Sequence, residues 1–147
     1  MSREFSYPID LVYTWVDGSD EELVKQRQKY EKQQNIHNDS KLPSRWRDLN
    51  ELKHSIDSAN RFAPWIRTIW VISDYQRPYW FDENNPGKVK FIDHPDIFQE
   101  YDEHLPTFNS HAIECHLHRI PELSDYFIYA NDDTFFGSAV TPLDFFN

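Results

Sequence analysis

Four short runs of strand-forming residues divide this chain, and each run stops at a cluster of polar residues. The runs are rich in β-branched and aromatic side chains and cover residues 9–16, 66–72, 89–92 and 126–130. The polar clusters that follow them are, in chain order, Asp17-Gly18, Ser73-Asp74, Asp93-His94 and Asn131-Asp132-Asp133. Runs of this length and composition predict strands, and a chain with four of them is expected to form a sheet.

Helical segments separate several of these strands. They are expected over residues 20–34, 48–62 and 110–120. In the second segment apolar residues recur at three- and four-residue steps, which indicates one apolar face. Asp48 and Glu51 at its start match a capping box, in which the two side chains cap each other's backbone N–H groups.

Helices between strands favour a mostly parallel sheet, because a strand that returns parallel to its neighbour needs a crossover connection. The carboxyl ends of parallel strands lie at one edge, and open α/β sheets bind their ligands there. The sequence therefore predicts an α/β fold with a mostly parallel open sheet and flanking helices. We expect a single domain over residues 1–147, with the four polar clusters along one edge of the sheet.

The composition supports a folded domain and limits its partners. Of the 147 residues, 39% are hydrophobic and 16% aromatic, which is enough for a core. The formal net charge of −10 disfavours nucleic acid and anionic membranes, since both select cationic surfaces. A phosphate-bearing ligand is compatible if a metal ion or a few arginines meet its charge. Cys115 is the only cysteine and no run reaches membrane-spanning length, so we expect a soluble protein without disulfides.

Asp132 and Asp133 are adjacent carboxylates at the end of a predicted strand. Two such charges repel each other, so a site normally supplies a cation or several donors to hold them. One interpretation is a hard divalent metal that bridges to the phosphates of a ligand. The other is a polar turn that leaves the strand, because Asn and Asp are common in turns. The pair alone does not decide between them, but the four clusters on one edge favour a binding site.

Two further segments could bind a nucleotide or an anion. Trp15 could stack on a base and Asp17 could hold a ribose or amide group, while Gly18 permits close backbone approach. The alternative is a strand-to-helix turn whose tryptophan belongs to the core. Arg45 and Arg47 precede a helix and could form an anion site there. They could equally be solvated residues beside a capping box.

The helical segment at 110–120 carries a polar stripe. His111, Glu114 and His118 fall on one helical face, opposite an apolar face. Imidazole and carboxylate groups on one face could transfer protons or bind zinc. Zinc is the weaker alternative, because the chain has neither an HExxH motif nor a cysteine pair. A polar stripe on an amphipathic helix is the ordinary interpretation.

Three stretches carry a family resemblance. They are IDLVYTWVDGSD at 9–20, RDLNEL through APWIR to SD over 47–74, and LPTFNSHAIECHLHRI with YANDDTFFG over 105–137. Together they resemble the Stealth family of capsule-type polysaccharide phosphotransferases, which includes the related catalytic subunit of the N-acetylglucosamine-1-phosphotransferase that tags lysosomal enzymes. The resemblance implies a nucleotide-sugar fold like that of GT-A glycosyltransferases. Family members continue beyond the Asp-pair motif, so the chain is expected to be the N-terminal part of a longer phosphotransferase.

The resemblance also implies an activity. A sugar 1-phosphate would pass from a nucleotide-sugar, expected to be a UDP-sugar, to a hydroxyl of an acceptor saccharide during capsule or exopolysaccharide synthesis. Catalysis at phosphorus consists of positioning and of neutralising charge, and in an acidic protein it implies Mg²⁺ or Mn²⁺. The alternatives are an ordinary glycosyltransferase and a non-catalytic nucleotide-sugar-binding module. The expected location is the bacterial cytoplasm, peripheral to the membrane only through partners.

Roles for individual residues follow from the same resemblance. Asp132 and Asp133 would hold the metal, and Asp133 would also be catalytic. His111, Glu114 and His118 are candidates for acceptor binding or proton transfer. The candidates for substrate binding are Trp15, Asp17, Gly18, Arg47, Asn50, Asp74 and Asn109. Among these, Arg47 and Asn50 would lie near the phosphates, and the residues of the first motif near the nucleoside.

Overall fold

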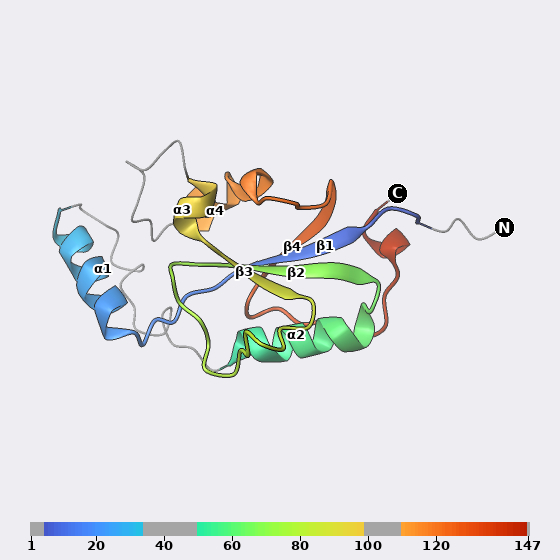
Figure 1. Cartoon of the computed structure of the whole chain (residues 1–147), viewed down its shortest axis with the longest axis horizontal. Helices are drawn as coiled ribbons and strands as arrows, with labels where there is room; N and C mark the ends of the chain where they lie inside the picture. Colours follow the sequence, from blue (N-terminus) through green and yellow to red (C-terminus); the bar gives the residue numbers. More distant parts are fainter. Residues whose placement is uncertain (1–4, 34–49, 99–109, 147) are drawn as a thin grey trace.

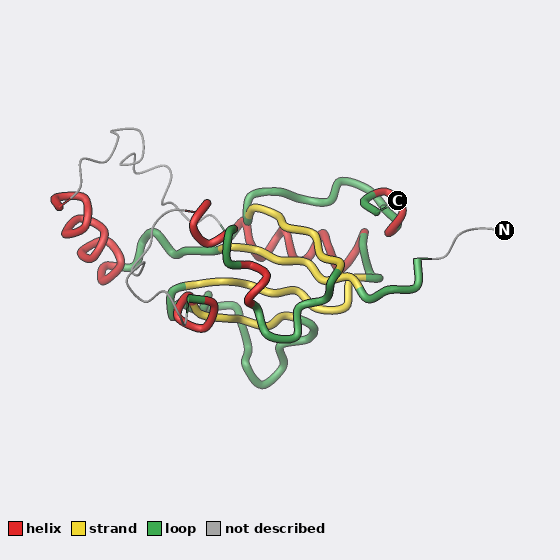
Figure 2. Tube along the Cα trace, turned by 90° about the horizontal axis from the view of Figure 1, so that it is seen from above, coloured by secondary structure: helices red, strands yellow, loops and turns green. Residues whose placement is uncertain are grey.

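A computed structural model describes residues 5–33, 50–98 and 110–146. The four predicted strands form one sheet, and they are β1 (Ile9–Thr14), β2 (Ile66–Ser73), β3 (Val89–Asp93) and β4 (Tyr126–Asn131). The strand order is β3-β2-β1-β4, and every pairing is parallel. Figure 2 shows the four strands side by side. The predicted α/β fold is therefore confirmed, with a sheet that is parallel throughout.

The strand register brings the carboxyl ends of the strands to one edge. Thr14 of β1 pairs with Ile72 of β2 on one side and with Asn131 of β4 on the other. Ser73, the last residue of β2, pairs with Asp93, the last residue of β3. The four polar clusters therefore follow strands that end together, as the sequence predicts. We refer to this side of the sheet as the carboxyl edge.

Helices lie on both faces of the sheet. α2 (Glu51–Phe62) covers one face, and α3 (His94–Ile97), α4 (Ser110–Glu114) and the 3-10 turn η4 (Leu117–Arg119) lie on the other (Figure 1). β1 lies between β2 and β4, so successive residues of β1 are buried on alternate faces. Leu11, Tyr13 and Trp15 pack in the core against α2, whereas Val12 packs in the core beneath α4 and η4.

The apolar face predicted for α2 is confirmed, since Leu52 and Ile56 are buried against the sheet. The start of this helix differs from the prediction. Asn50 is the N-cap, in the left-handed conformation (φ 62°) and without a side-chain capping bond, so Glu51 is the first helical residue and not the third. The expected capping box is therefore wrong, and its other member, Asp48, lies outside the described residues.

The continuous helix predicted over 110–120 is also wrong, because α4 ends at Glu114 and the tighter turn η4 follows. The imidazole Nδ1 of His116 lies 2.7 Å from the carbonyl oxygen of Ala112, and the ring stacks on Phe98 with centroids 4.1 Å apart. An α-helix would use that carbonyl for the backbone N–H of His116, which instead donates to Ile113 O at 2.9 Å. His118 therefore follows a break in the helix and does not share one continuous helical face with His111.

α1 (Glu21–Gln33) matches the first predicted helix and extends beyond the carboxyl edge (Figure 1). Its start is set by Asp20, whose Oδ1 accepts a hydrogen bond from the backbone N–H of Glu22 at 2.9 Å. A last 3-10 turn, η5 (Pro142–Asp144), lies near the C-terminal end of the described chain. Across the described ranges no helix has the length and apolar character that a membrane span requires.

Candidate functional site

The strand order creates a switch point between β1 and β4. From β1 the chain moves outward through β2 to β3 and then returns to β4 on the other side of β1. α2 and α4, which precede β2 and β4, accordingly lie on opposite faces of the sheet (Figure 1). In open α/β sheets a crevice forms outside the carboxyl ends of the strands at such a point, and ligands bind in it. The residues that directly follow β1 and β4 are therefore the first candidates for a site.

Asp132 and Asp133 occupy a tight turn at the end of β4. The backbone N–H of Thr134 donates to Asn131 O at 3.1 Å, and the Thr134 hydroxyl donates to the same oxygen at 2.7 Å. Asp132 and Asp133 are the two central residues of this turn, with Asp132 half-buried and Asp133 exposed. The turn interpretation is thus correct for the backbone. It also places both acidic residues at the switch point.

Hydroxyl groups of α2 hold the far side of this turn. Ser55, which is fully buried, donates to Thr134 O, and its Oγ lies 2.6 Å from the hydroxyl of Tyr13. One helical turn later, Ser58 Oγ accepts a hydrogen bond from the backbone N–H of Phe136 at 3.0 Å. Both serines point at the segment that follows the Asp pair. The position of the acidic turn is therefore fixed by α2 as well as by β4.

A second polar group lies on the opposite face of the sheet, around Tyr129. The Tyr129 hydroxyl donates to Glu114 Oε1 at 3.1 Å and lies 3.2 Å from Thr14 Oγ1. The other carboxylate oxygen of Glu114 lies 3.5 Å from Nδ1 of His111, which is largely exposed. Two of the three predicted residues on the polar stripe therefore meet at the carboxyl ends of β1 and β4. Tyr129, which sequence reasoning missed, connects them to the sheet.

The charge of Asp132 reaches both groups. Burial raises the pKa of Tyr13, and the carboxylate of Asp132 raises it further. Burial also raises the pKa of Tyr129, with added contributions from Glu114 and from Asp132. The carboxylate of Asp132 therefore acts on tyrosines on both faces of the sheet. Among the described residues, the carboxylates of Asp132 and Glu114 thus bring negative charge to the switch point.

The donor set of the Asp pair fits a metal ion that arrives with a ligand. Within the described ranges, no three His, Cys, Asp or Glu side chains are grouped so that they could hold a metal by themselves. Asp132 and Asp133 would therefore supply two protein ligands. Mg²⁺ is commonly bound through one or two carboxylates, while phosphate oxygens and water complete its octahedron. Carboxylate oxygens at an exposed turn match this arrangement and do not resemble a closed metal cage.

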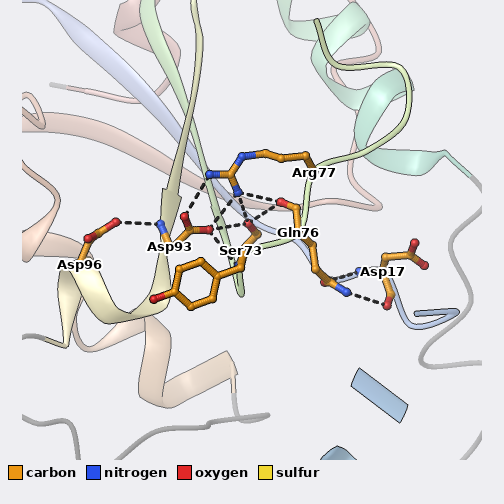
Figure 3. A network of polar contacts seen from close by, with 7 residues as sticks. Asp17, Ser73, Gln76, Arg77, Asp93 and Asp96 are labelled. Carbon is orange, nitrogen blue, oxygen red and sulfur yellow. Dashed lines mark hydrogen bonds and ion pairs between the residues drawn. The ribbon is translucent and has the colours of Figure 1, made fainter. Parts of the chain in front are cut away.

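The carboxyl ends of β1, β2 and β3 are joined by a separate network (Figure 3). The carboxylate of Asp17 is bonded within its own loop, where it accepts hydrogen bonds from the backbone N–H and the hydroxyl of Ser19 at 2.9 and 2.6 Å. The backbone of Asp17 is bound by the side chain of Gln76, through Asp17 N–H to Oε1 at 2.9 Å and Nε2 to Asp17 O at 3.2 Å. Gln76, another residue that sequence reasoning missed, thus joins the loop after β1 to the loop after β2.

An ion pair anchors the loop after β2 to β3. Arg77 donates from both terminal nitrogens to the carboxylate of Asp93, at 2.9 and 3.0 Å. Burial acts to raise the pKa of Asp93, but hydrogen bonds and charge from Arg77 outweigh it, together with bonds from Tyr75 and Ser73, so that the pKa is lowered. Asp93 is thus committed to the loop structure and is not a free ligand. Nor is Arg77 a free anion-binding arginine, because its guanidinium is neutralised in place.

His94 is a buried titratable group at the same edge. It follows Asp93 and is 7% exposed. Burial lowers its pKa, and the carboxylates of Asp74 and Asp93 oppose that effect. Asp74, a predicted substrate-binding residue, lies half-buried beside this histidine. The polar clusters after β2 and β3 therefore do converge, as the sequence predicts.

Other predicted residues have different outcomes. Trp15 is 4% exposed and packs in the core against α2, so the prediction that it stacks on a base is wrong. Gly18 lies in the loop after β1, beside Asp17. Asn50 caps α2 and is therefore a structural residue at a helix N-terminus. Arg47 and Asn109 lie outside the described residues.

Comparison with known proteins identifies the family. Residues 45–147 match the model described as Stealth protein CR2, conserved region 2, and residues 7–34 match Stealth protein CR1, conserved region 1. An exopolysaccharide phosphotransferase of Streptomyces coelicolor is 42% identical over 146 residues, which are 99% of this chain and 24% of that protein. A capsular polysaccharide phosphotransferase of Neisseria meningitidis serogroup B is 40% identical over 146 residues, with 96% of this chain and 38% of that protein covered.

A third relative extends the comparison to another genus. A capsular polysaccharide phosphotransferase of Haemophilus influenzae is 41% identical over 140 residues, covering 95% of this chain and 38% of that protein. The chain thus spans between a quarter and two-fifths of the length of these relatives. The match with the two conserved-region models covers most of the chain and confirms the resemblance noted in the sequence. The chain belongs to the Stealth family.

Proposed function

We propose that this chain is part of a phosphotransferase that moves a sugar 1-phosphate from a nucleotide-sugar to a saccharide hydroxyl, in the synthesis of capsule or exopolysaccharide. The observation that carries the proposal is the Asp132-Asp133 turn at the switch point of a parallel sheet, where a phosphate-bearing ligand would bind. The names of the relatives, capsular and exopolysaccharide phosphotransferases, support the reaction class. A cytoplasmic location, with membrane association only through partners, belongs to the same proposal.

The proposed reaction forms one bond to phosphorus and breaks another. The acceptor hydroxyl oxygen bonds to the phosphorus that carries the sugar. The bond from this phosphorus to the oxygen that bridges to the nucleoside phosphate breaks, and the nucleoside monophosphate leaves with the electron pair. Negative charge is spread over the non-bridging oxygens during this transfer. A Mg²⁺ or Mn²⁺ ion held by Asp132 and Asp133 would supply positive charge at these oxygens.

The residues of the chain divide the remaining tasks. We assign Glu114, with His111 beside it, to the proton of the acceptor hydroxyl, because its carboxylate lies at the switch point, held by Tyr129. The loop after β1 that contains Asp17 and Gly18 would receive the nucleoside part of the donor. His118 is not part of this assignment, since the break after α4 separates it from His111.

Four other residues remain proposed to contact the substrates. Asn50 lies at the N-terminus of α2, the positive end of the helix dipole, which favours phosphate oxygens. Arg47, three residues earlier in the chain, would add positive charge to the same region. Asp74 and Asn109 remain proposed contacts to substrate. These assignments are secondary to the Asp pair and depend on it.

The binding part of the proposal is tested by calorimetric titration with UDP in the presence and absence of Mg²⁺. Wild-type protein is expected to bind UDP only with Mg²⁺, and Asp132→Asn and Asp133→Asn are each expected to weaken that binding about tenfold or more. Asp125→Asn is the matched control, because Asp125 is exposed at the amino end of β4 and should not alter the affinity. Unchanged affinity in both turn variants would rule out the metal role.

The reaction itself is identified by the released nucleotide. The intact protein is incubated with Mg²⁺, UDP-N-acetylglucosamine as the probe donor and an oligosaccharide acceptor. Release of UMP with a new phosphodiester supports phosphotransfer, whereas release of UDP would indicate an ordinary glycosyltransferase that attacks the anomeric carbon. Mg²⁺-dependent binding without a nucleotide product from any tested donor would favour the non-catalytic binding module.

A further inference from the structure

Gln76 carries a polar side chain that is almost fully buried and that bonds entirely to another loop. Its exposed fraction is 9%, and its amide contacts the loop 17–20 after β1 in three places. Oε1 accepts from the N–H of Asp17 at 2.9 Å, and Nε2 donates to the carbonyl of the same residue at 3.2 Å. Nε2 also donates to Oδ2 of Asp20 at 3.3 Å. One amide group therefore holds both ends of the loop, with Gly18 between them.

This contact continues the pairing of the strands past their ends. The last backbone bond between the β1 and β2 segments runs from Trp15 N–H to Ile72 O, at 2.9 Å. Two residues later, the Gln76 amide binds the N–H and the C=O of Asp17, as a neighbouring strand would do. A primary amide suits this task because it carries an acceptor and a donor on one planar group. Glutamate would lack the donor, and an aliphatic residue would lack both.

The position of Gln76 is itself fixed from two strands (Figure 3). The backbone carbonyl oxygen of Gln76 accepts hydrogen bonds from Ser73 Oγ at 2.9 Å and from Arg77 Nη1 at 2.8 Å. Ser73 belongs to β2, and Arg77 is paired with Asp93 at the end of β3. The backbone N–H of Tyr75, which has a left-handed conformation (φ 57°), also donates to Asp93 at 2.9 Å. The Gln76 amide is thus a rigid extension of the sheet.

We propose that Gln76 is a positioning residue, which holds the loop 17–20 in the conformation that receives the nucleoside part of the donor. This inference rests on the proposed function, because it takes that loop as part of the nucleotide site. Gln76 does not contact the ligand in this proposal. It acts through the backbone of Asp17 and through the carboxylate of Asp20, whose other oxygen caps α1. Without the amide, the loop would sample other conformations and bind the donor less often in the competent one.

The first measurement needs no ligand. Hydrogen exchange of the Asp17 amide, followed by NMR, reports directly on its bond to Gln76. In Gln76→Ala this amide is expected to exchange about five- to tenfold faster than in wild type, the range expected for the loss of one hydrogen bond. Gln76→Glu keeps the acceptor and should keep the amide protected. Gln28→Ala, an exposed glutamine of α1, is the control that should change nothing.

The second measurement is the calorimetric affinity for UDP with Mg²⁺. Gln76→Ala is expected to bind about fivefold or more weakly. Gln76→Glu should also bind weakly at pH 8, because its carboxylate cannot donate to Asp17 O and repels Asp20. Its affinity relative to wild type at the same pH should recover toward pH 5, since a protonated carboxyl regains an O–H donor. In the intact protein, Gln76→Ala should raise KM for the nucleotide-sugar and leave KM for the acceptor unchanged.

Failure of this inference can be told apart from failure of the proposed function. If wild-type protein does not bind UDP, the proposed function fails, and with it the nucleotide role of the loop. If wild type binds and Gln76→Ala binds equally well, the positioning role is refuted, whatever the exchange rate of Asp17. Should Gln76→Ala fail to fold, Gln76→Glu decides alone, because an affinity equal to that of wild type at pH 8 would refute the proposal.

Discussion

Replacing Asp10 by alanine should be among the most damaging single changes in the sheet. Asp10 lies at the amino end of β1 and is fully buried. Its carboxylate accepts two bonds from the guanidinium of Arg67 at 2.9 and 2.6 Å, one from Trp70 Nε1 at 3.1 Å and one from the N–H of Ser124 at 2.9 Å. These partners belong to β2 and to the segment before β4. One carboxylate thus ties together three segments that are far apart in the sequence.

The expected loss of unfolding free energy follows from the hydrogen-bond donors that Asp10→Ala leaves without an acceptor. The side chain of Arg67 is 44% exposed, so it can turn to water when its partner is removed. The donors on Trp70 and Ser124 are buried and have no such alternative, and each unsatisfied buried donor costs about 1–3 kcal/mol. The two donors together give an expected loss of about 2–6 kcal/mol, a large part of the 5–15 kcal/mol that is typical for a domain.

Urea unfolding followed by circular dichroism measures this loss. Asp57→Asn is the matched control, because Asp57 forms an i,i+4 pair with Lys53 at 3.4 Å on the surface of α2. Removing that exposed pair is expected to cost no more than about 0.5 kcal/mol. A loss below about 1 kcal/mol in Asp10→Ala would refute the reasoning, since it would mean that the buried donors find other partners.

Two further predictions concern acid stability and the support of the Asp pair. Burial acts to raise the pKa of Asp10, but its donors, led by Arg67, outweigh it and lower the pKa below the usual 3.8. Its contribution is therefore full above the unfolded pKa near 3.9 and is lost as the pH falls through the lower folded pKa. In urea titrations between pH 7 and pH 2, the free energy of unfolding should fall below about pH 4, and less steeply in Asp10→Asn. Ser55→Ala should lower the free energy of unfolding by about 1–3 kcal/mol, because it removes the partner of Thr134 O and of the Tyr13 hydroxyl. It should also weaken Mg²⁺-dependent UDP binding, since Ser55 supports the turn that carries the Asp pair. The exposed control, Ser138→Ala, should change neither quantity.

Much of the architecture could be predicted because it depends on local chemistry. Runs of β-branched and aromatic residues mark the strands, and the helical segments between them favour parallel pairing. Once the strands are parallel, the polar clusters after each of them must share one edge. For the same reason Asp132 and Asp133 could be placed at a candidate site before any contact was known. The sequence alone thus determined the fold class and the edge of the sheet at which the candidate site lies.

The predictions from local sequence were wrong where a tertiary contact overrides the local preference. The periodicity of residues 110–120 favours one helix, but the His116 ring stacks on Phe98 and takes the carbonyl that the next helical bond requires. Trp15 has an aromatic ring that could stack on a base, yet its place directly after β1, bonded to β2, turns the ring into the core. Neither outcome is visible in the neighbouring residues of the sequence.

The partners of the polar residues were decided by the tertiary structure alone. The strand order sets Gln76 beside Asp17, 59 residues away, and Arg67 beside Asp10, 57 residues away. Tyr129 meets Glu114 because β4 returns next to β1 and α4 lies over that pair. Such pairs depend on which strands are neighbours and on which face each side chain points to. Local patterns do not determine which strands are neighbours, so the acidic edge could be predicted but not the side chains that hold it in place.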